Sequence, residues 1–252
     1  MGDLSAHSLL TPLLLTHLCL FRQLNLSNNR LCGVWVEYGT QKGNYITEGI
    51  NAIADALRVN CALTSLELRG NQLGDKGWGA IFAAIRGNKD SKITSLDASS
   101  ENIGPVGGNA VAAMVAVTGG LTSINLSGNR LTNYGTDMTG IKELAAALGV
   151  NGALTKCNLS ANSIGAEGAK RLADALRVNG GLTSLDLSCN QLCGLIDGCG
   201  TYTAEGITAI ADALRVNGGL MTLNLSINNI GGEGEASIRN AVQEKAGFEL
   251  HL

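Results

Sequence analysis

The sequence has few of the residues and motifs that catalysis, metal binding or nucleic-acid binding usually require. It has three histidines, His7, His17 and His251, and all of them lie near the ends of the chain. No Gly-x-Ser-x-Gly motif, phosphate-binding loop or zinc motif is present. Because 18 Lys and Arg residues face 21 Asp and Glu residues, the net charge of −3 provides no basic surface for nucleic acid. We therefore predict that the protein is not an enzyme and has no catalytic residue, cofactor, metal ion or nucleic-acid partner.

Prolines and long apolar runs are also scarce. The chain has two prolines and 45% hydrophobic residues, which excludes a linker-rich or disordered protein. No run reaches the roughly 18 apolar residues of a transmembrane helix, so we predict no membrane association. The apolar segment Leu9 to Phe21 has no basic flank and no small-residue cleavage site. We favour an apolar cap or partial repeat over residues 1–20, and a secretory signal is the alternative.

The seven cysteines are an odd number, which is unusual for a disulfide framework. Cys189, Cys193 and Cys199 are spaced C-x3-C-x5-C, without a nearby histidine or a fourth ligand. We interpret the cysteines as reduced, mainly structural thiols of a cytoplasmic protein, with zinc binding as the alternative. Asn-Leu-Ser occurs four times, at Asn25, Asn125, Asn158 and Asn224. All four lie at the same place in a repeated strand, where glycans would crowd one another, so the cytoplasm is again favoured.

One repeated pattern dominates the chain. The template L-x-x-L-x-L-x-x-N-x-L matches seven times, with 28 to 42 residues between successive starts. The matches begin at Phe21, Leu63, Ile93, Leu121, Leu154, Leu182 and Leu220. Apolar residues alternate within each match, as at Leu185 and Leu187, which predicts a short strand with one buried face. A helical period follows, as at Ile207, Ile210 and Leu214, which predicts an amphipathic helix.

A single strand–helix unit cannot bury its own apolar side, so the units must stack on one another. We predict an α/β solenoid, a horseshoe with a parallel inner sheet and outer helices. Residues 21–252 should form this domain, with seven repeats and a terminal strand within Phe248–Leu252. Trp78, Phe82, Phe21 and Phe248 lie at strand or helix positions, and we expect them in the core.

Asparagines mark two places in the repeat. The ninth position carries Asn in six of seven repeats, and its amide should satisfy backbone groups in the turn after the strand. Asn60, Asn179 and Asn217 follow helices, and we expect them in the left-handed conformation of a helix end. The third repeat departs from the pattern, because Ala98 replaces a core leucine and Glu101 replaces the ninth-position Asn. This departure is either tolerated drift or a soft joint in the solenoid.

The units LTSLDLSCNQL and AEGITAIADALRVNG, in repeats of about 28 residues, resemble leucine-rich repeats of the ribonuclease-inhibitor type. The same subclass includes the sensor repeats of NOD-like receptors and the Ran GTPase-activating protein. The resemblance covers Phe21 to Leu252 and implies a cytoplasmic protein-binding scaffold. Because the family shares a surface and not a reaction, the resemblance says nothing of a particular partner.

Two surfaces are candidates for recognition. The concave sheet face is small, polar and nearly neutral, and its candidate residues are Glu67, Arg69, Lys156 and Asp186. The other candidates lie in three insertions, Leu31–Gly49, Leu131–Gly140 and Leu192–Gly206, which should leave the same end of the sheet. These insertions hold the aromatic candidates Trp35, Tyr38, Tyr45, Tyr134 and Tyr202. The aromatic residues either bind a partner or pack against their own repeats.

We therefore expect a non-catalytic scaffold, a monomer, that recognises a partner protein through its rim loops and concave sheet. Two alternatives remain at this point. The chain is a fragment of a NOD-like-receptor-type sensor, because both ends look like incomplete repeats, or it is a GTPase-activating regulator. No functional residue of the latter family can be matched in the sequence.

Overall fold

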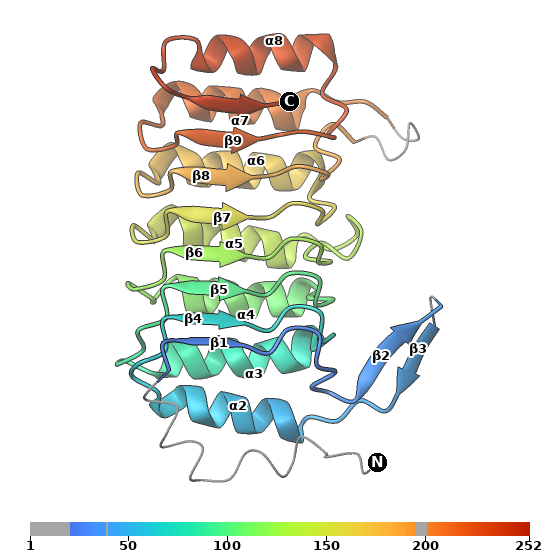
Figure 1. Cartoon of the computed structure of the whole chain (residues 1–252). Coiled ribbons are helices and arrows are strands. Elements are labelled where there is room, and N and C mark those ends of the chain that lie inside the picture. Colours follow the sequence, from blue (N-terminus) through green and yellow to red (C-terminus); the bar gives the residue numbers. More distant parts are fainter. Residues whose placement is uncertain (1–20, 39, 195–200) are drawn as a thin grey trace.

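The computed structural model describes residues 21–38, 40–194 and 201–252, so the segment 1–20 lies outside the described residues. The main sheet has eight parallel strands that follow one another in chain order (Figure 1). They are β1 (Gln23–Asn25), β4 (Ser65–Glu67), β5 (Ser95–Asp97), β6 (Ser123–Asn125), β7 (Lys156–Asn158), β8 (Ser184–Asp186), β9 (Thr222–Asn224) and β10 (Glu249–His251). Each of these strands has three residues, and its middle residue faces the core.

A helix lies between each pair of successive strands of this sheet in the described chain. The helices are α2 (Glu48–Val59), α3 (Gly74–Gly87), α4 (Pro105–Val115), α5 (Thr139–Val150), α6 (Gly165–Val178), α7 (Glu205–Val216) and α8 (Gly231–Val242). They form a second layer behind the sheet (Figure 1). The predicted solenoid, with a parallel sheet on one face and helices on the other, is confirmed.

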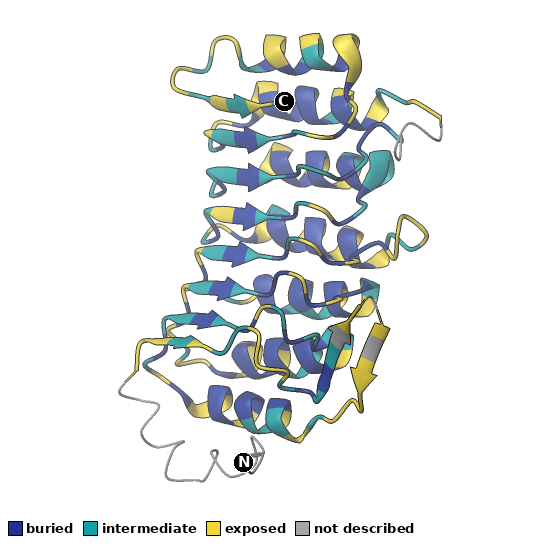
Figure 2. Cartoon of the chain, turned by 45° about the vertical axis from the view of Figure 1, so that its right-hand side comes forward, coloured by how far each residue is buried: buried dark blue, intermediate teal, exposed yellow. Residues whose placement is uncertain are grey.

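The core runs without a break between the two layers. The middle residues of the strands pair in register from one repeat to the next, as Leu66 does with Leu96 and Leu96 with Ile124. The apolar stripes of the helices close the core from the other side, and the buried residues form one cluster from Cys32 to Ala241. Figure 2 shows these buried stripes on the inner side of each helix. Trp78 and Phe82 are fully buried as expected, but Phe21 is 59% exposed, so its predicted core position is wrong.

Five of the six ninth-position asparagines form a buried ladder, which confirms their predicted role; Asn29, at the start of the ladder, is exposed. Asn190, for example, donates from Nδ2 to the carbonyl oxygens of Leu159 (2.9 Å) and Leu187 (3.0 Å). Its Oδ1 accepts the backbone N–H groups of Asn162 (2.9 Å) and Ile164 (3.3 Å) in the preceding repeat. One amide therefore satisfies backbone groups in two repeats and joins them.

A second asparagine ladder lies at the other edge of the sheet, after the helices. Asn179 donates to the carbonyl oxygens of Leu148 (2.6 Å) and Asn151 (2.7 Å) in the repeat before it. Its Oδ1 accepts the N–H groups of Gly181 (3.0 Å) and Leu182 (2.8 Å), just before the next strand. The predicted left-handed conformation is wrong, because φ is −76° at Asn60, −81° at Asn179 and −76° at Asn217. These asparagines are extended and buried, and they link repeats as the ninth-position asparagines do.

The first insertion contains a β-hairpin that the sequence analysis did not predict. Its strands, β2 (Val34–Glu37) and β3 (Thr40–Gly43), pair in antiparallel register. Val34 anchors the base of the hairpin because its side chain is buried in the core. Gly43 has a φ of +82°, and an added Cβ would lie 2.0 Å from the backbone oxygen of Gly33. A residue with a side chain would therefore disrupt the base of the hairpin.

Candidate functional site

The three insertions share one edge of the solenoid, which we call the insertion rim. Each insertion follows the carboxyl end of a strand, β1, β6 or β8, and Figure 1 shows all three leaving the sheet on the same side. Insertion 1 is Leu31–Gly49, insertion 2 is Leu131–Gly140 and insertion 3 is Leu192–Gly206; residues 39 and 195–200 lie outside the described residues. The burial pattern in Figure 2 shows insertion 1 as largely exposed.

Insertion 1 presents aromatic residues on its hairpin. Tyr38 is 100% exposed and has a φ of 47°, so its backbone occupies the left-handed region. Trp35 is half-buried, and the guanidinium of Arg30 lies 4.7 Å from its ring centroid. This distance is within the range of a cation–π contact. Both rings are therefore accessible at the surface: the Tyr38 ring is fully exposed, whereas the Trp35 ring contacts Arg30.

Insertion 2 repeats the same pairing of arginine and aromatic ring. The guanidinium of Arg130 lies 5.2 Å from the ring centroid of Tyr134, which is 60% exposed. Asp137 accepts hydrogen bonds from the backbone N–H (2.9 Å) and the hydroxyl (2.7 Å) of Thr139. These two bonds lower the pKa of Asp137. The carboxylate is thus engaged by its own loop at the start of α5.

Tyr45 and Tyr202 use their hydroxyl groups to fix insertions 1 and 3 to the repeats. Tyr45 donates to the backbone oxygen of Leu73 (2.6 Å), and Tyr202 donates to that of Ile230 (2.6 Å). In both cases the acceptor lies in the turn of the next repeat. Their rings remain partly exposed, but their polar ends are committed to the scaffold. Of the two alternatives for the aromatic residues, Tyr45 and Tyr202 therefore follow the second: they pack against the chain's own repeats.

The residue near the start of insertions 1 and 2 makes a second contact with the turn of the next repeat. Cys32 donates from Sγ to the backbone oxygens of Asn71 (3.1 Å) and Gln72 (3.3 Å). Thr132 donates to the backbone oxygens of Asn162 (3.2 Å) and Ser163 (2.7 Å). Both side chains are fully buried. These insertions are therefore held at their bases while their outer parts face solvent.

We expect Tyr45→Phe and Tyr202→Phe to loosen insertions 1 and 3 without unfolding the solenoid. Each change removes one hydroxyl hydrogen bond between the insertion and the next repeat, which is worth about 1 kcal/mol and corresponds to roughly fivefold faster local opening. The Leu73 oxygen keeps the N–H of Gly77 (3.1 Å) as a donor, so the repeat itself should stay folded. Hydrogen exchange at Val34–Glu37 measures the effect of Tyr45→Phe. Tyr134→Phe is the matched control, because no hydrogen bond of its hydroxyl is found among the described residues. Equal exchange rates in Tyr45→Phe and the parent would contradict the anchoring role.

Glu101 lies beneath insertion 1 and takes the ninth position of the third repeat. Its side chain is fully buried, and Oε1 accepts the N–H of Asn71 (2.6 Å). Its Oε2 accepts the N–H of Leu73 (2.8 Å) and the indole Nε1–H of Trp78 (3.1 Å). The carboxylate thus keeps the accepting role of the missing Asn and adds a bond to Trp78. The pairing of Glu101 with Trp78 was not predicted from the sequence, in which Glu101 is visible only as a departure from the repeat pattern.

The described thiols are poor nucleophiles where they are buried. Burial raises the pKa of Cys32 and Cys193, and it raises that of Cys157 to about 12. The five described cysteines, Cys32, Cys61, Cys157, Cys189 and Cys193, are free thiols. Cys199, the third residue of the spacing considered for zinc, lies outside the described residues. Within the described part of the chain, no cluster of His, Cys, Asp or Glu is arranged to hold a metal ion.

Two acidic residues of the concave face accept hydrogen bonds from neighbouring residues. Asp186 accepts the N–H (2.9 Å) and the hydroxyl (2.7 Å) of Ser188, which holds the turn after β8. Glu67 accepts a hydrogen bond from Asn25 Nδ2 (2.6 Å). Arg69 and Lys156 are exposed. The four predicted concave residues lie in three different repeats, and the structure does not gather them into one cluster.

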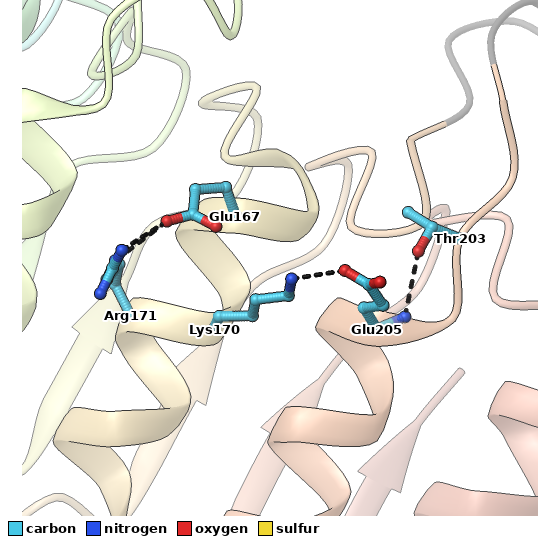
Figure 3. Close-up of polar contacts among 5 residues, drawn as sticks. All are labelled: Glu167, Lys170, Arg171, Thr203 and Glu205. Carbon is cyan, nitrogen blue, oxygen red and sulfur yellow. Dashed lines mark hydrogen bonds and ion pairs between the residues drawn. The ribbon is translucent and has the colours of Figure 1, made fainter.

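Charged residues on the helices link neighbouring repeats behind insertion 3. Lys170 of α6 pairs with Glu205 of α7, and Arg171 pairs with Glu167 (2.7 Å) within α6 (Figure 3). The Thr203 hydroxyl accepts the Glu205 N–H (3.3 Å) where insertion 3 meets α7. The pair with Lys170 lowers the pKa of Glu205. Because both members are well exposed, this pair contributes little to stability.

Comparison with known proteins identifies the repeat. A family model described as Leucine Rich repeat matches residues 59–82 and 220–237, and another described as Leucine Rich Repeat matches residues 181–201. The described chain is a leucine-rich-repeat solenoid. Leucine-rich repeats are typical of protein-binding scaffolds, which build an extended surface from stacked units. No curated protein sequence matches the chain.

Solved structures with a similar arrangement are distant in sequence. The actin-binding site 2 of leiomodin-1 is 16% identical, with 81% of this chain and 86% of that chain covered at a TM-score of 0.41. The leucine-rich-repeat protein LegL7 of Legionella pneumophila is 21% identical, with coverages of 87% and 71% and a TM-score of 0.45. The C-terminal domain of Caenorhabditis elegans tropomodulin is 11% identical, with coverages of 91% and 89% and a TM-score of 0.35. No helix in the described part of the chain has the length and apolarity of a membrane span.

Proposed function

We propose that this chain is a non-catalytic scaffold that binds a partner protein on the insertion rim and the adjacent concave sheet. The observation that carries the proposal is the placement of exposed aromatic rings. Trp35, Tyr38 and Tyr134 stand on the rim, where insertions 1 and 2 are fixed at their bases by Cys32 and Thr132. Aromatic side chains on a rigid base are the usual energetic centres of protein interfaces.

The five aromatic candidates of the insertions have two different roles. Tyr45 and Tyr202 act mainly as anchors, because their hydroxyl groups bind backbone oxygens of the next repeat. Trp35, Tyr38 and Tyr134 therefore lead as contact residues. Arg69 and Lys156 extend the surface onto the concave sheet, because both are exposed. Glu67 and Asp186 lie at the border of this surface. Their carboxylates are already hydrogen-bonded to the neighbouring side chains of Asn25 and Ser188.

The proposal also includes the subclass and the location of the protein. Outer α-helices of 11 to 14 residues in every described repeat support the ribonuclease-inhibitor type. We propose residues 21–252 as one repeat domain, acting as a monomer in the cytoplasm. Reduced thiols support the location, since five described cysteines are free and three of them are buried with raised pKa values.

Shortening the insertions tests the proposal. Each insertion is replaced by the three-residue connection Gly165–Glu167, which joins Ile164 to Gly168 in the fifth repeat. Circular dichroism and thermal unfolding should show a retained fold, because the fifth repeat folds with this connection and the strand and helix residues of the core are kept. The buried Cys32, Val34 and Cys193 are lost with insertions 1 and 3, so a lower unfolding temperature is expected. Proteins captured from a cell lysate and identified by mass spectrometry should be lost from the variant lacking insertions 1 and 2. For Trp35→Ala or Tyr38→Ala, we expect the loss of about 2 kcal/mol of binding free energy, roughly thirtyfold in affinity.

A matched control separates specific recognition from nonspecific binding to exposed apolar residues. Val150 and Val178 are exposed apolar residues at the ends of α5 and α6, away from the rim. Replacing both with Ser should leave the captured proteins unchanged. If the shortened variant captures the same proteins as the parent, the rim does not carry recognition and the proposal fails.

A further inference from the structure

A row of four polar residues runs along the insertion rim from the first repeat to the fourth. Arg30, Gln72, Asn102 and Arg130 all occupy the tenth position of their repeats. Three of them lie in the left-handed region, with φ of 53° at Arg30, 56° at Gln72 and 57° at Asn102. Gln72 is half-buried, and the other three are exposed. Because the strands stack in register, one such residue is presented by each successive repeat.

Each end of the row is an arginine in contact with an aromatic ring. Arg30 stacks on Trp35 and Arg130 stacks on Tyr134, with guanidinium-to-centroid distances of 4.7 Å and 5.2 Å. A cation–π contact consumes none of the guanidinium's N–H donors, so they stay available for a carboxylate. Neither arginine forms an ion pair with another described residue. The rings therefore hold both cations in place without neutralising them.

The neighbouring acidic groups are mostly occupied elsewhere. Asp75 accepts the N–H groups of Gly104 (2.6 Å) and Gly107 (3.0 Å). Asp137 is bound to Thr139, and Glu101 is buried beneath the row. Glu37 is exposed on the hairpin, opposite Thr40 in the strand register. The row itself thus has two cationic ends and an uncharged middle.

We infer that this row binds an extended acidic segment of the partner protein, with two carboxylates four residues apart; the inference rests on the proposed function. Three strand spacings separate the repeats of Arg30 and Arg130, which is about 14 Å, and four residues of extended chain span nearly the same length. Each guanidinium takes one carboxylate in a bidentate pair. The amides of Gln72 and Asn102, which both donate and accept, bind the backbone between the two carboxylates.

A display experiment tests this inference on the full chain. A phage library of random twelve-residue peptides is selected against the parent protein and, in parallel, against Arg30→Gln/Arg130→Gln. Acidic pairs with a spacing of four residues should be enriched on the parent and not on the double variant. A peptide enriched on the parent should lose about fivefold in affinity with each single change, as for an ion pair of about 1 kcal/mol. Replacing both of its acidic residues by amides should reduce binding as strongly as the double variant does.

The control is Arg86→Gln/Arg177→Gln, which changes the net charge equally. Both arginines are exposed at the ends of α3 and α6, and neither is paired among the described residues. This control should retain the parent's affinity. The inference is overturned if the selected peptides lack the acidic spacing, if none is enriched, or if both double variants bind them equally. If the peptides bind through Trp35 and Tyr38 alone, the row is rejected while the proposed rim function stands.

Discussion

Glu101→Gln should lower the free energy of unfolding by about 2 kcal/mol, although the two side chains have nearly the same shape. The carboxylate accepts three N–H groups, two on Oε2 and one on Oε1. A glutamine amide has one accepting oxygen, so its NH₂ group must face a buried N–H donor in either orientation. Urea unfolding of the parent and the variant at pH 7 measures the difference.

The pH dependence of the same comparison gives a second observable. Burial raises the pKa of Glu101, and the hydrogen bonds from Leu73, Asn71 and Trp78 only partly oppose this. A carboxyl group with a raised pKa in the folded state contributes most to stability below its unfolded pKa, and this contribution falls as the pH rises through the folded pKa. Because the glutamine of the variant does not titrate, the stability advantage of the parent over Glu101→Gln should shrink between pH 4 and pH 7. An advantage that grows over this range would show that the three donors outweigh burial.

Trp78→Phe provides the control for this prediction. The indole Nε1–H meets Glu101 in the next repeat, so the two residues should be energetically coupled. Replacing Glu101 by Asn, the residue found in the other repeats, should destabilise the parent because Trp78 loses its acceptor. The same replacement should be less harmful in the Trp78→Phe background. Additive effects of the two changes would contradict the pairing.

The sequence was sufficient to predict the fold because the pattern of each repeat defines where its strand and its helix lie. Leu185 and Leu187 alternate within a strand, Ile207 and Ile210 follow with helical spacing, and the unit returns at intervals of 28 residues or more. Each of these signals lies within one repeat. Stacking then follows, because a single unit leaves its apolar side open. The eight-stranded parallel sheet, with its strands in chain order, agrees with this prediction.

The features that were missed depend on contacts between repeats. The donors that meet Glu101 belong to Asn71, Leu73 and Trp78, which lie 23 to 30 residues earlier. The asparagines after the helices bind carbonyl oxygens at the helix end of the preceding repeat, and no spacing within one repeat reveals this. Their resemblance to left-handed helix ends led to the wrong conformation. A comparison of equivalent positions between repeats would have pointed to the ladder that follows the helices.

The candidate site was predicted in outline only. Insertion length and tyrosine content located the rim, but they did not distinguish the anchors Tyr45 and Tyr202 from the free ring of Tyr38. The distinguishing contacts are hydrogen bonds to backbone oxygens, which any residue type can provide. The hairpin of insertion 1 was also missed, although Val34 and Val36 alternate around Trp35, because the strand pattern is only four residues long.

Asn190→Ala is expected to have the largest effect of any change considered, a loss of about 3 kcal/mol in the free energy of unfolding. Its carbonyl partners each have a second amide donor, since Asn162 also binds Leu159 (3.0 Å) and Asn228 also binds Leu187 (2.9 Å). The N–H groups of Asn162 and Ile164 have no such replacement among the described residues. Two buried donors would therefore be left unpaired, next to the cavity left by the missing amide.

Asn29→Ala is the matched control for this prediction, because it makes the same chemical change at the exposed start of the ladder. Asn29 donates only to its own turn, at the backbone oxygen of Ser27 (3.2 Å). Its replacement should change the free energy of unfolding by less than about 0.5 kcal/mol. Since repeats interact mainly with their neighbours, Asn190→Ala should also speed hydrogen exchange at Asn162 and Ile164 more than at Leu66. Similar losses for the two variants would mean that the leucine core, and not the asparagine ladder, holds the fifth and sixth repeats together.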